Sequence, residues 1–423
     1  MTSSCFNFIT YKILLKLPIN LLTLIILSRW LALVEYPFWK RMTQPSDSDT
    51  HIDQKMSALK DKRRVRDSNL RIFASPDQYP IVYSSKYDVT FYGLEKMHPF
   101  DSQKWGKVFR ALKDAHFLTN HNYVIPNEAT REDLLLAHTS AYLDTLKQKH
   151  VLAKAMEVPL VGYIPFFSKF ADSFVLAPFR HHVGGTVAAA CLALERGWAI
   201  NIGGGFHHAA SEKAGGFCLY NDVTIAIRFL LQGESIKKAM IIDLDAHQGN
   251  GYERAFTDDD RVYIFDMFNR NAFPRDEEAK KGINLAVPLK RFTEDEEYIE
   301  KLETHIVQAF NEFTPDLIVY NAGTDVFDAD HLGCLSITED GIEKRDEIVF
   351  KKAADLEIPI VMVTSGGYTE DSANIITQSI LNLKKKGLLP LTKTQKPKTD
   401  TPKPKTEKSF DEVEALAEKI ANL

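Results

Sequence analysis

Between residues 78 and 388 the chain alternates short apolar runs with longer stretches in which apolar residues recur at helical spacing. The apolar runs are 199–202, 239–242, 262–265, 317–320 and 358–363, and the helical stretches include 184–195, 222–231, 295–313 and 338–356. The runs are continuous rather than alternating, as expected for strands that are buried on both faces. Strand–helix–strand order predicts an α/β fold with a central, mostly parallel sheet flanked by helices.

Both ends of the chain differ from this central body. Residues 1–42 form an apolar N-terminal extension, in which the run 17–34 is interrupted by Pro18, Asn20 and Arg29. Because an arginine within the run is costly in a bilayer, a poorly ordered extension or a helix resting on the surface is the favoured interpretation, and a membrane anchor or signal in 17–34 is the alternative. Residues 43–77 are polar and charged, and we interpret them as a linker.

Two further features bear on location and on the C-terminal end. Residues 60–66 form a basic cluster of the nuclear-localisation type, so we expect a nuclear or cytoplasmic protein, with membrane association by the N-terminal segment as the alternative. Residues 389–408 are rich in lysine, proline and threonine and predict a disordered linker. Residues 409–423 have the spacing of a short amphipathic helix.

Composition narrows the class of protein only moderately. The 423 residues are 44% hydrophobic and 26% charged, which is typical of a globular protein, and the formal net charge of −5 gives no reason to expect direct nucleic-acid binding. The four cysteines, Cys5, Cys191, Cys218 and Cys334, form no CxxC pair. This favours a reducing compartment and argues against a zinc site built from cysteines.

Polar residues that can bind a metal or take part in catalysis follow four of the predicted strands, at the point where each apolar run ends. They are His207 and His208 after the first run, Asp243, Asp245 and His247 after the second, Asp325 after the fourth, and Tyr368 after the fifth. Ligands bind outside the carboxyl ends of the strands in a parallel sheet. We therefore expect these side chains to meet at one edge of the sheet.

Carboxylate and imidazole ligands in this pattern suit zinc. Asp245 and His247 are two positions apart and face the same way in an extended backbone, and Asp325 adds a second carboxylate. Such a set leaves a coordination position open, and zinc lowers the pKa of water from about 16 to roughly 7. A neighbouring histidine can then take a proton from water and return it to a leaving amine.

Supporting roles follow from the residues around this group. Asp243 and Asn250 are candidates to hold the rings of His207 and His208, and because one partner is ionised and the other neutral, the two imidazoles are expected to differ in basicity. Tyr368 follows two glycines and can donate a hydrogen bond to a developing oxyanion. The set describes hydrolysis of an amide or ester carbonyl.

Each of these residues also has a structural interpretation, as a helix cap, a turn residue or a packed core side chain. That interpretation is favoured for a second tandem pair, His181 and His182, which precedes Gly184 at a predicted helix start. It is also favoured for Cys218 as a small buried residue, with a place near the floor of the site as the alternative.

The body of the chain resembles the zinc-dependent histone deacetylases, and most closely their class IV branch. The matching stretches are 79–84, 93–101, 195–208, 215–218, 242–251, 320–325 and 363–368. The resemblance covers residues 78–388 and implies a single catalytic domain of the arginase/deacetylase type that removes acyl groups from the Nε atom of lysine. It implies zinc ligands at Asp245, His247 and Asp325, paired histidines at His207 and His208 with His208 as general base, a transition-state tyrosine at Tyr368, a substrate tunnel lined by Gly216 and Phe217, and structural potassium near Asp243.

The same resemblance implies a chromatin regulator that acts on acylated lysine of histones or other proteins, with a co-repressor complex as a candidate partner. The class IV resemblance implies that long-chain fatty-acyl lysine is a candidate substrate in addition to acetyl-lysine. Many relatives have an acidic residue where this chain has Asn250. The alternatives are a deacetylase of small molecules such as acetylpolyamines and an inactive scaffold. An arginase-type pair of metal ions needs a carboxylate where this chain has Gly249, which favours one metal.

Overall fold

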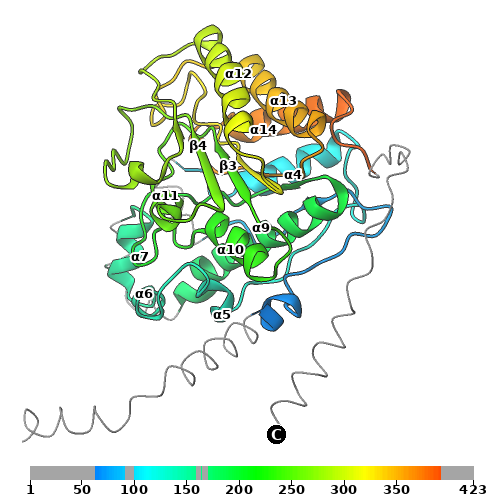
Figure 1. Ribbon diagram of the computed structural model, residues 1–423. Coiled ribbons are helices and arrows are strands. Elements are labelled where there is room, and N and C mark those ends of the chain that lie inside the picture. Colours follow the sequence, from blue (N-terminus) through cyan, green and yellow to red (C-terminus); the bar gives the residue numbers. More distant parts are fainter. Residues whose placement is uncertain (1–61, 91–99, 159–162, 164–169, 392–423) are drawn as a thin grey trace, which may run out of the picture. The chain divides into compact units, whose positions relative to one another are not determined.

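The computed structural model describes residues 62–90, 100–158, 163 and 170–391 (Figure 1). By internal contacts the chain divides into residues 1–64 and 65–423, and the sheet with its helices belongs to the second unit. The predicted N-terminal extension, most of the charged linker and nearly all of the segment 389–423 lie outside the described residues, so these boundaries stay predictions. Among the described helices, none combines the length and apolar character needed to cross a membrane.

A seven-stranded sheet forms the centre of the described body, and every strand pair in it is parallel. The strands are β1 (Ile81–Val82), β2 (Trp198–Asn201), β3 (Ala239–Asp243), β4 (Val262–Asp266), β5 (Leu285–Ala286), β6 (Leu317–Asn321) and β7 (Ile360–Val363). Their order across the sheet is β1-β2-β7-β6-β3-β4-β5. The α/β fold with a parallel sheet, expected from the sequence, is confirmed.

The five longer strands coincide with the five apolar runs, because each run is buried on both faces of the sheet. The edge strands β1 and β5 contain two residues each, and strands this short leave no recognisable hydrophobic pattern in the sequence. In register, Asp243 lies opposite Asn321, and Asn321 lies opposite Val363. The carboxyl ends of β3, β6 and β7 are therefore level with one another.

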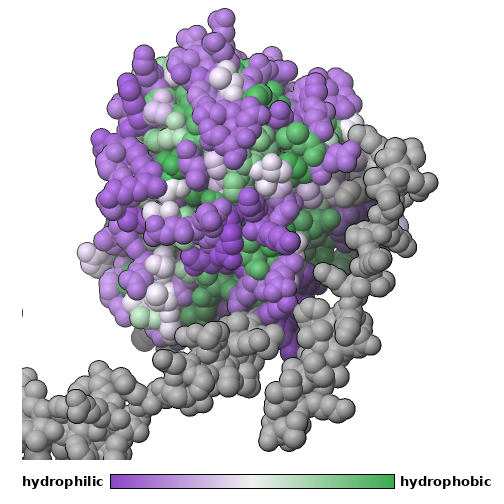
Figure 2. Space-filling model, in the orientation of Figure 1, coloured by the Kyte–Doolittle hydropathy of each residue, from purple (hydrophilic) through white to green (hydrophobic). Residues whose placement is uncertain are grey.

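Helices cover both faces of the sheet (Figure 1). They are α4 (Lys104–Asp114), α5 (Arg131–Leu134), α6 (Ser140–Thr145), α7 (Lys149–Ala155), α9 (Ala177–Arg196), α10 (Asp222–Gln232), α11 (Asn250–Phe256), α12 (Asp295–Glu312), α13 (Glu339–Asp355) and α14 (Ser372–Lys385), with the π-helical turn η3 (Asp172–Leu176) and the 3₁₀ turn η4 (Ala279–Gly282). Helices α9 and α10 pack together on one side, with α9 against the strands, and α12, α13, α14 and α4 pack in sequence on the other. The visible surface is mostly hydrophilic, with scattered apolar patches (Figure 2).

The start of helix α9 that was expected from the sequence is wrong. The helix begins at Ala177, seven positions before Gly184, so His181 and His182 lie within its first turns and not ahead of it. Glycine interrupts the helical pattern here because of close packing: a Cβ on Gly184 would lie 1.9 Å from the backbone oxygen of Asn127. The glycine is required by that contact, and tertiary packing outweighs its low helix propensity.

Candidate metal centre and catalytic pocket

Four strand ends deliver the polar residues singled out in the sequence to one edge of the sheet. His207 and His208 follow β2, Asp245 and His247 follow β3, and the segments after β6 and β7 carry Asp325 and Tyr368. All of these side chains are buried or nearly so. The convergence follows from the parallel order β2-β7-β6-β3, which places the ends of these four strands next to one another.

Asp245, His247 and Asp325 form a compact, buried group. Their ligand atoms all lie within 4.8 Å of one another. Nδ1 of His247 lies 2.8 Å from Oδ2 of Asp325 and 3.2 Å from Oδ1 of Asp245. The three donor atoms therefore face a common point, as the ligands of one small cation do.

The backbone around this group fixes both carboxylates. Oδ1 of Asp325 accepts a hydrogen bond of 2.8 Å from the backbone N–H of Ala246. Oδ2 of Asp245 accepts from the backbone N–H of Gly366 at 3.1 Å and from the hydroxyl of Ser365 at 3.2 Å. Each carboxylate thus keeps an orientation toward His247.

The charge of this group matches a divalent cation. Burial and the nearby charge of Asp245 raise the pKa of Asp325 to about 7, because two carboxylates share one buried site. A dication removes that repulsion, and two carboxylates with one neutral imidazole balance its charge and leave an open position. In donor type, number and placement, Asp245, His247 and Asp325 fit zinc.

His207 and His208 point their Nε2 atoms toward each other at 3.1 Å, beside this group. Nδ1 of His207 lies 2.8 Å from Oδ2 of Asp243, and Nδ1 of His208 lies 2.9 Å from Oδ1 of Asn250. The partners expected from the sequence are therefore the partners in the structure. One ring is held by a carboxylate and the other by an amide.

These partners separate the two histidines in basicity. Burial lowers the pKa of His207, but Asp243 and Asp245 outweigh it and raise that pKa to about 9. Burial and the neighbouring imidazoles of His207 and His247 hold the pKa of His208 well below its usual value. Asp243 therefore favours the protonated form of His207, whereas the surroundings of His208 favour its neutral ring.

Hydrogen bonding also assigns the tautomer of His208. The amide N–H of Asn250 donates to Oδ2 of Asp276 at 3.3 Å, which turns the amide oxygen toward His208. Nδ1 of His208 therefore carries its proton and donates to that oxygen. Nε2 of His208 is then the unprotonated nitrogen that a general base needs; it lies 3.1 Å from Nε2 of His207, and the His208 side chain lines the pocket.

Asp243 lies behind the histidines and is surrounded by donors. Its Oδ1 accepts from the backbone N–H of Asp245 at 2.9 Å and from the amide of Asn321 at 3.1 Å, and the Tyr252 hydroxyl donates to its Oδ2. Sequence reasoning missed Asn321 and Tyr252 as partners of Asp243. Potassium near Asp243 stays a prediction.

Tyr368 faces the metal group from the far side of the pocket. Its ring centroid lies 5.9 Å from that of His247, and its backbone N–H donates to Oδ2 of Asp330 at 2.8 Å. Burial, together with the charges of Asp325 and Asp245, raises the pKa of the Tyr368 hydroxyl well above 10. The hydroxyl stays protonated at neutral pH and is a hydrogen-bond donor.

Lys104 is a buried residue of the site that sequence reasoning missed. Its ammonium group, fully buried in α4, donates to the backbone oxygens of Ser365 and Gly366 and so fixes the loop that carries Tyr368. Burial lowers the pKa of Lys104 to about 8. A single lysine in an amphipathic helix gives no sequence signal for this role, because such residues are normally exposed.

Gly216 and Phe217 lie in the wall of a pocket of about 330 Å³ that also reaches His208, His247 and Tyr368. A Cβ at Gly216 would lie 2.4 Å from Cδ2 of His208, so a side chain there would displace the ring. The Phe217 ring packs 4.8 Å from that of Phe100 and is 5% exposed. Both residues therefore line the pocket next to the metal group, and their role in a substrate tunnel stays a prediction.

A smaller space of about 20 Å³ lies against the metal group and is lined in part by Asp245, Phe206, Phe217 and Cys218. Cys218 is 4% exposed, and its thiol donates to the backbone oxygen of Gly216 at 3.2 Å. Cys218 is therefore both a small buried residue and part of the floor of the site.

The other tandem pair, His181 and His182, does not reach the metal group. His182 is fully buried, stacks on Tyr87 at 4.1 Å, and accepts a hydrogen bond of 3.1 Å at Nδ1 from the backbone N–H of Gly204. The structural interpretation of this pair is confirmed. Its contribution to the site is indirect, because it supports the loop that precedes His207.

Comparisons with known proteins agree with this geometry. Residues 98–383 match the histone deacetylase domain. Histone deacetylase 2 of Arabidopsis thaliana is 47% identical over 328 residues, which cover 78% of this chain and 84% of that protein. The acetoin utilization protein AcuC of Bacillus subtilis is 30% identical, over 61% of this chain and 68% of the relative.

Solved structures show the same fold. An HDAC homologue from Aquifex aeolicus superposes with a TM-score of 0.57 at 24% identity, over 73% of this chain and 83% of that one. An HDAC homologue complexed with SAHA gives a TM-score of 0.58 at 24% identity, over 73% and 84% of the two chains. At this level of identity, the likeness supports the arrangement of sheet and helices.

Proposed function

The chain belongs to the histone deacetylase family, and from that premise we propose that it is a zinc-dependent hydrolase of Nε-acyl-lysine on histones or other proteins. The proposal rests on the buried group Asp245, His247 and Asp325. Beside this group lies a pair of histidines whose different hydrogen-bond partners give their rings different basicity. A metal group alone would fit many activities. Its position at the foot of a narrow pocket with a base and a protonated tyrosine favours hydrolysis of an acyl group.

The side chain of acyl-lysine is expected to pass along the wall that contains Gly216 and Phe217 and to place its carbonyl near the metal group and Tyr368. A zinc ion held by Asp245, His247 and Asp325 supplies Lewis acidity toward water and toward the acyl carbonyl. The Tyr368 hydroxyl donates a hydrogen bond to the carbonyl oxygen as negative charge develops on it.

The histidines move the protons. Nε2 of His208 takes a proton from the attacking water as the new C–O bond forms, and gives it to the lysine nitrogen as the C–N bond breaks. His207, whose protonated form Asp243 favours, lies beside His208 and stabilises the negative charge of the transition state. The products are a carboxylate and the free amine of lysine.

The smaller space beside Asp245 favours a short acyl group. About 20 Å³ is close to the space of one water molecule, which suits a methyl group better than a fatty chain. We therefore propose acetyl-lysine as the preferred substrate and keep long-chain acyl-lysine, which the class IV resemblance raises, as the competing specificity. Class IV membership and nuclear location belong to the proposal and rest on the sequence motifs and on the basic cluster 60–66.

Hydrolysis by the zinc-loaded full chain on three matched substrates tests the proposal. Peptides carrying acetyl-lysine and myristoyl-lysine at the same position, and an acetylpolyamine, are compared by release of the free amine. Faster release from the acetyl peptide is expected. Faster release from the myristoyl peptide would reverse the proposed acyl preference, activity on the polyamine alone would favour a small-molecule deacetylase, and inactivity on all three with zinc bound would favour a scaffold.

A further inference from the structure

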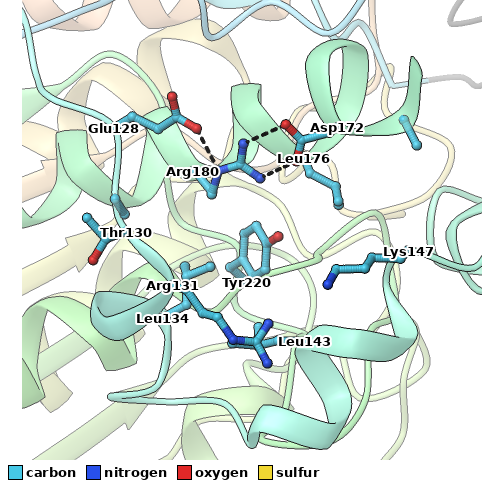
Figure 3. A pocket seen from close by; sticks show the side chains of 12 residues that line it. Glu128, Thr130, Arg131, Leu134, Leu143, Lys147, Asp172, Leu176, Arg180 and Tyr220 are labelled. Carbon is cyan, nitrogen blue, oxygen red and sulfur yellow. Dashed lines mark hydrogen bonds and ion pairs between the residues drawn. The ribbon is translucent and has the colours of Figure 1, made fainter. Parts of the chain in front are cut away.

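A second and larger cavity lies away from the metal group, between α5, α6, η3 and the beginning of α9 (Figure 3). Its volume is about 820 Å³, within the range of small-molecule sites. We call it the Tyr220 cavity after the aromatic ring at its floor. It is lined by Glu128, Ala129, Thr130, Arg131, Leu134, Leu143, Lys147, Ala171, Asp172, Leu176, Arg180 and Tyr220.

Arg180 forms ion pairs with both carboxylates of the lining. Nε of Arg180 lies 2.6 Å from Oε1 of Glu128, and its two Nη atoms lie 2.8 and 3.1 Å from the two carboxylate oxygens of Asp172. Figure 3 shows this triad on one side of the Tyr220 ring. Because Arg180 uses its charge on both partners, the triad is a fixed wall of the cavity and offers little free positive charge to a ligand.

The other two charged residues of the lining, Arg131 and Lys147, are both cations. They share a single carboxylate, Asp144, through contacts of 3.1 Å from Arg131 and 3.3 Å from Lys147. The side chains of Arg131 and Lys147 are 38% and 72% exposed, so neither is committed to the protein interior. Figure 3 shows the amine of Lys147 directed toward the cavity. With one carboxylate between two cations, this side of the cavity carries an excess positive charge.

The remaining surface of the cavity is apolar, with a polar group at the floor. Leu134, Leu143 and Leu176 contribute aliphatic wall. Tyr220 is 3% exposed, and burial raises the pKa of its hydroxyl to about 12, which keeps it a hydrogen-bond donor. An apolar wall beside a cationic rim is complementary to a molecule with an apolar body and an anionic head.

We propose that the Tyr220 cavity is a second ligand site, which binds a small amphipathic carboxylate with its head between Arg131 and Lys147 and its apolar part against the leucine wall. A singly charged carboxylate is favoured over phosphate because Arg131, Lys147 and Asp144 together carry one positive charge, whereas the triad of Arg180 with Glu128 and Asp172 carries one negative charge that would repel further charge on the ligand. The site does not depend on the catalytic activity of the protein.

The cavity also borders the catalytic pocket through one short segment of chain. Gly216, Phe217 and Cys218 line the catalytic side, whereas Tyr220, two residues later, lines the second cavity. Tyr142 of α6 donates to the backbone oxygen of Leu219 at 2.7 Å and fixes the segment between the two. A ligand in the Tyr220 cavity would therefore lie directly behind the wall of the proposed substrate tunnel.

Calorimetric titration of the full chain with octanoate tests the proposal. Octanol and octylamine, which have the same apolar part and a neutral or cationic head, are the comparison ligands. We expect octanoate to bind and the other two to bind at least about tenfold more weakly, because only the carboxylate gains charge-assisted hydrogen bonds.

Three variants locate the binding. Arg131→Gln with Lys147→Gln removes the cationic rim, and Ala171→Phe fills the cavity without a change of charge. Arg261→Gln with Lys301→Gln is the matched control, because it removes the same charges from ion pairs with Asp259 and Glu297 that do not line the cavity. Both cavity variants should weaken octanoate binding about tenfold or more, and the control should bind as the wild type does.

Because Arg131 and Lys147 are exposed, the charge variant, Arg131→Gln with Lys147→Gln, is expected to fold normally. Its affinity for octanoate therefore tests the proposal even if Ala171→Phe is unstable. Absence of octanoate binding to the wild type would overturn the proposal. So would octanol binding as tightly as octanoate, or octanoate binding to the charge variant with unchanged affinity, which would place the ligand elsewhere, including the catalytic pocket.

Discussion

The catalytic pocket and the Tyr220 cavity lie on two sides of the same short segment, residues 215–222, and differ in how they use charge. Around the metal group, the charged side chains are buried and are held by another functional group, as Asp243 holds His207, although the same pocket is also lined by the exposed Glu157 and Arg291. In the cavity, the cations Arg131 and Lys147 are exposed and share one carboxylate. Buried, mutually held charges have defined protonation states, whereas exposed ones are free to pair with a ligand.

This difference separates substitutions by their consequences. A change in the catalytic pocket leaves a buried charge without its partner and disturbs the reaction itself, because each group acts through the next one. A change at the rim of the Tyr220 cavity removes an exposed charge and should affect only what binds there. We therefore expect the loss of turnover to be largest at the metal group and to vanish at the cavity rim.

Replacement of Asp325 by alanine should have the largest effect. It removes one of three ligands and the carboxylate that holds Nδ1 of His247 at 2.8 Å, so we expect loss of bound zinc and a fall in turnover of about 10³-fold or more. Metal analysis of the purified variant, together with its activity, measures both. A variant with a full complement of zinc would exclude Asp325 as a ligand.

Replacement of His208 by alanine should stop turnover with the metal retained. The neutral ring with a free Nε2 is the proposed base, and its loss is expected to reduce kcat by about 10²–10⁴-fold. His181→Ala is the matched control, since His181 belongs to the tandem pair that does not reach the metal group. Loss of activity in both variants would indicate a structural effect, and substantial activity of His208→Ala would contradict the role of the base.

Replacement of Tyr368 by phenylalanine should lower kcat about 10²–10³-fold with a smaller change in KM. The ring keeps its packing against Phe100 and His247, while the hydroxyl donor is lost. Steady-state kinetics on an acetyl-lysine peptide separate the two parameters. A rise in KM with unchanged kcat would show that Tyr368 binds the substrate equally in ground and transition states.

Replacement of Asn250 by aspartate should move the pH profile rather than abolish activity. Burial and neighbouring imidazoles hold the pKa of His208 low, and a carboxylate at Nδ1 would raise it. The base would then become protonated at a higher pH, so the acidic limb of kcat/KM should shift to higher pH while activity in alkaline solution is retained. An unchanged acidic limb, measured over the full pH range, would assign that limb to another group.

The double variant Arg131→Gln with Lys147→Gln should have the smallest effect, with kcat and KM for acetyl-lysine peptide close to those of the wild type when no carboxylate ligand is present. Both side chains are exposed, and surface ion pairs contribute about 0–1 kcal/mol. Steady-state kinetics of the variant and the wild type, measured side by side, check this. A large loss of turnover would show that the two regions are not independent.

The sequence predicts those parts of the structure that depend on a single local rule. Five apolar runs are five strands because burial on both faces requires uninterrupted hydrophobic residues. Asp245 and His247 meet Asp325 because the carboxyl ends of parallel strands share one edge. The motif-based partners Asp243 and Asn250 contact the histidines as expected.

The parts that the sequence does not predict depend on contacts between distant segments. Lys104 reaches the loop of Tyr368 across more than 250 residues, and no local pattern marks a lysine that will be buried. Gly184 lies inside α9 because the backbone at Asn127 approaches it, although glycine usually indicates a helix boundary. The Tyr220 cavity is formed by α5, α6, η3, the beginning of α9 and the loop residue Tyr220, and none of these segments carries a motif.

Zinc titration of metal-free full-length protein, with amine release from an acetyl-lysine peptide followed in the same samples, decides whether one metal ion at Asp245, His247 and Asp325 supports the reaction. We expect no turnover without metal and activity that rises linearly to a plateau at a single equivalent of zinc. Full turnover by the metal-free protein, or a plateau reached only at two equivalents, would contradict a single metal centre at these three residues.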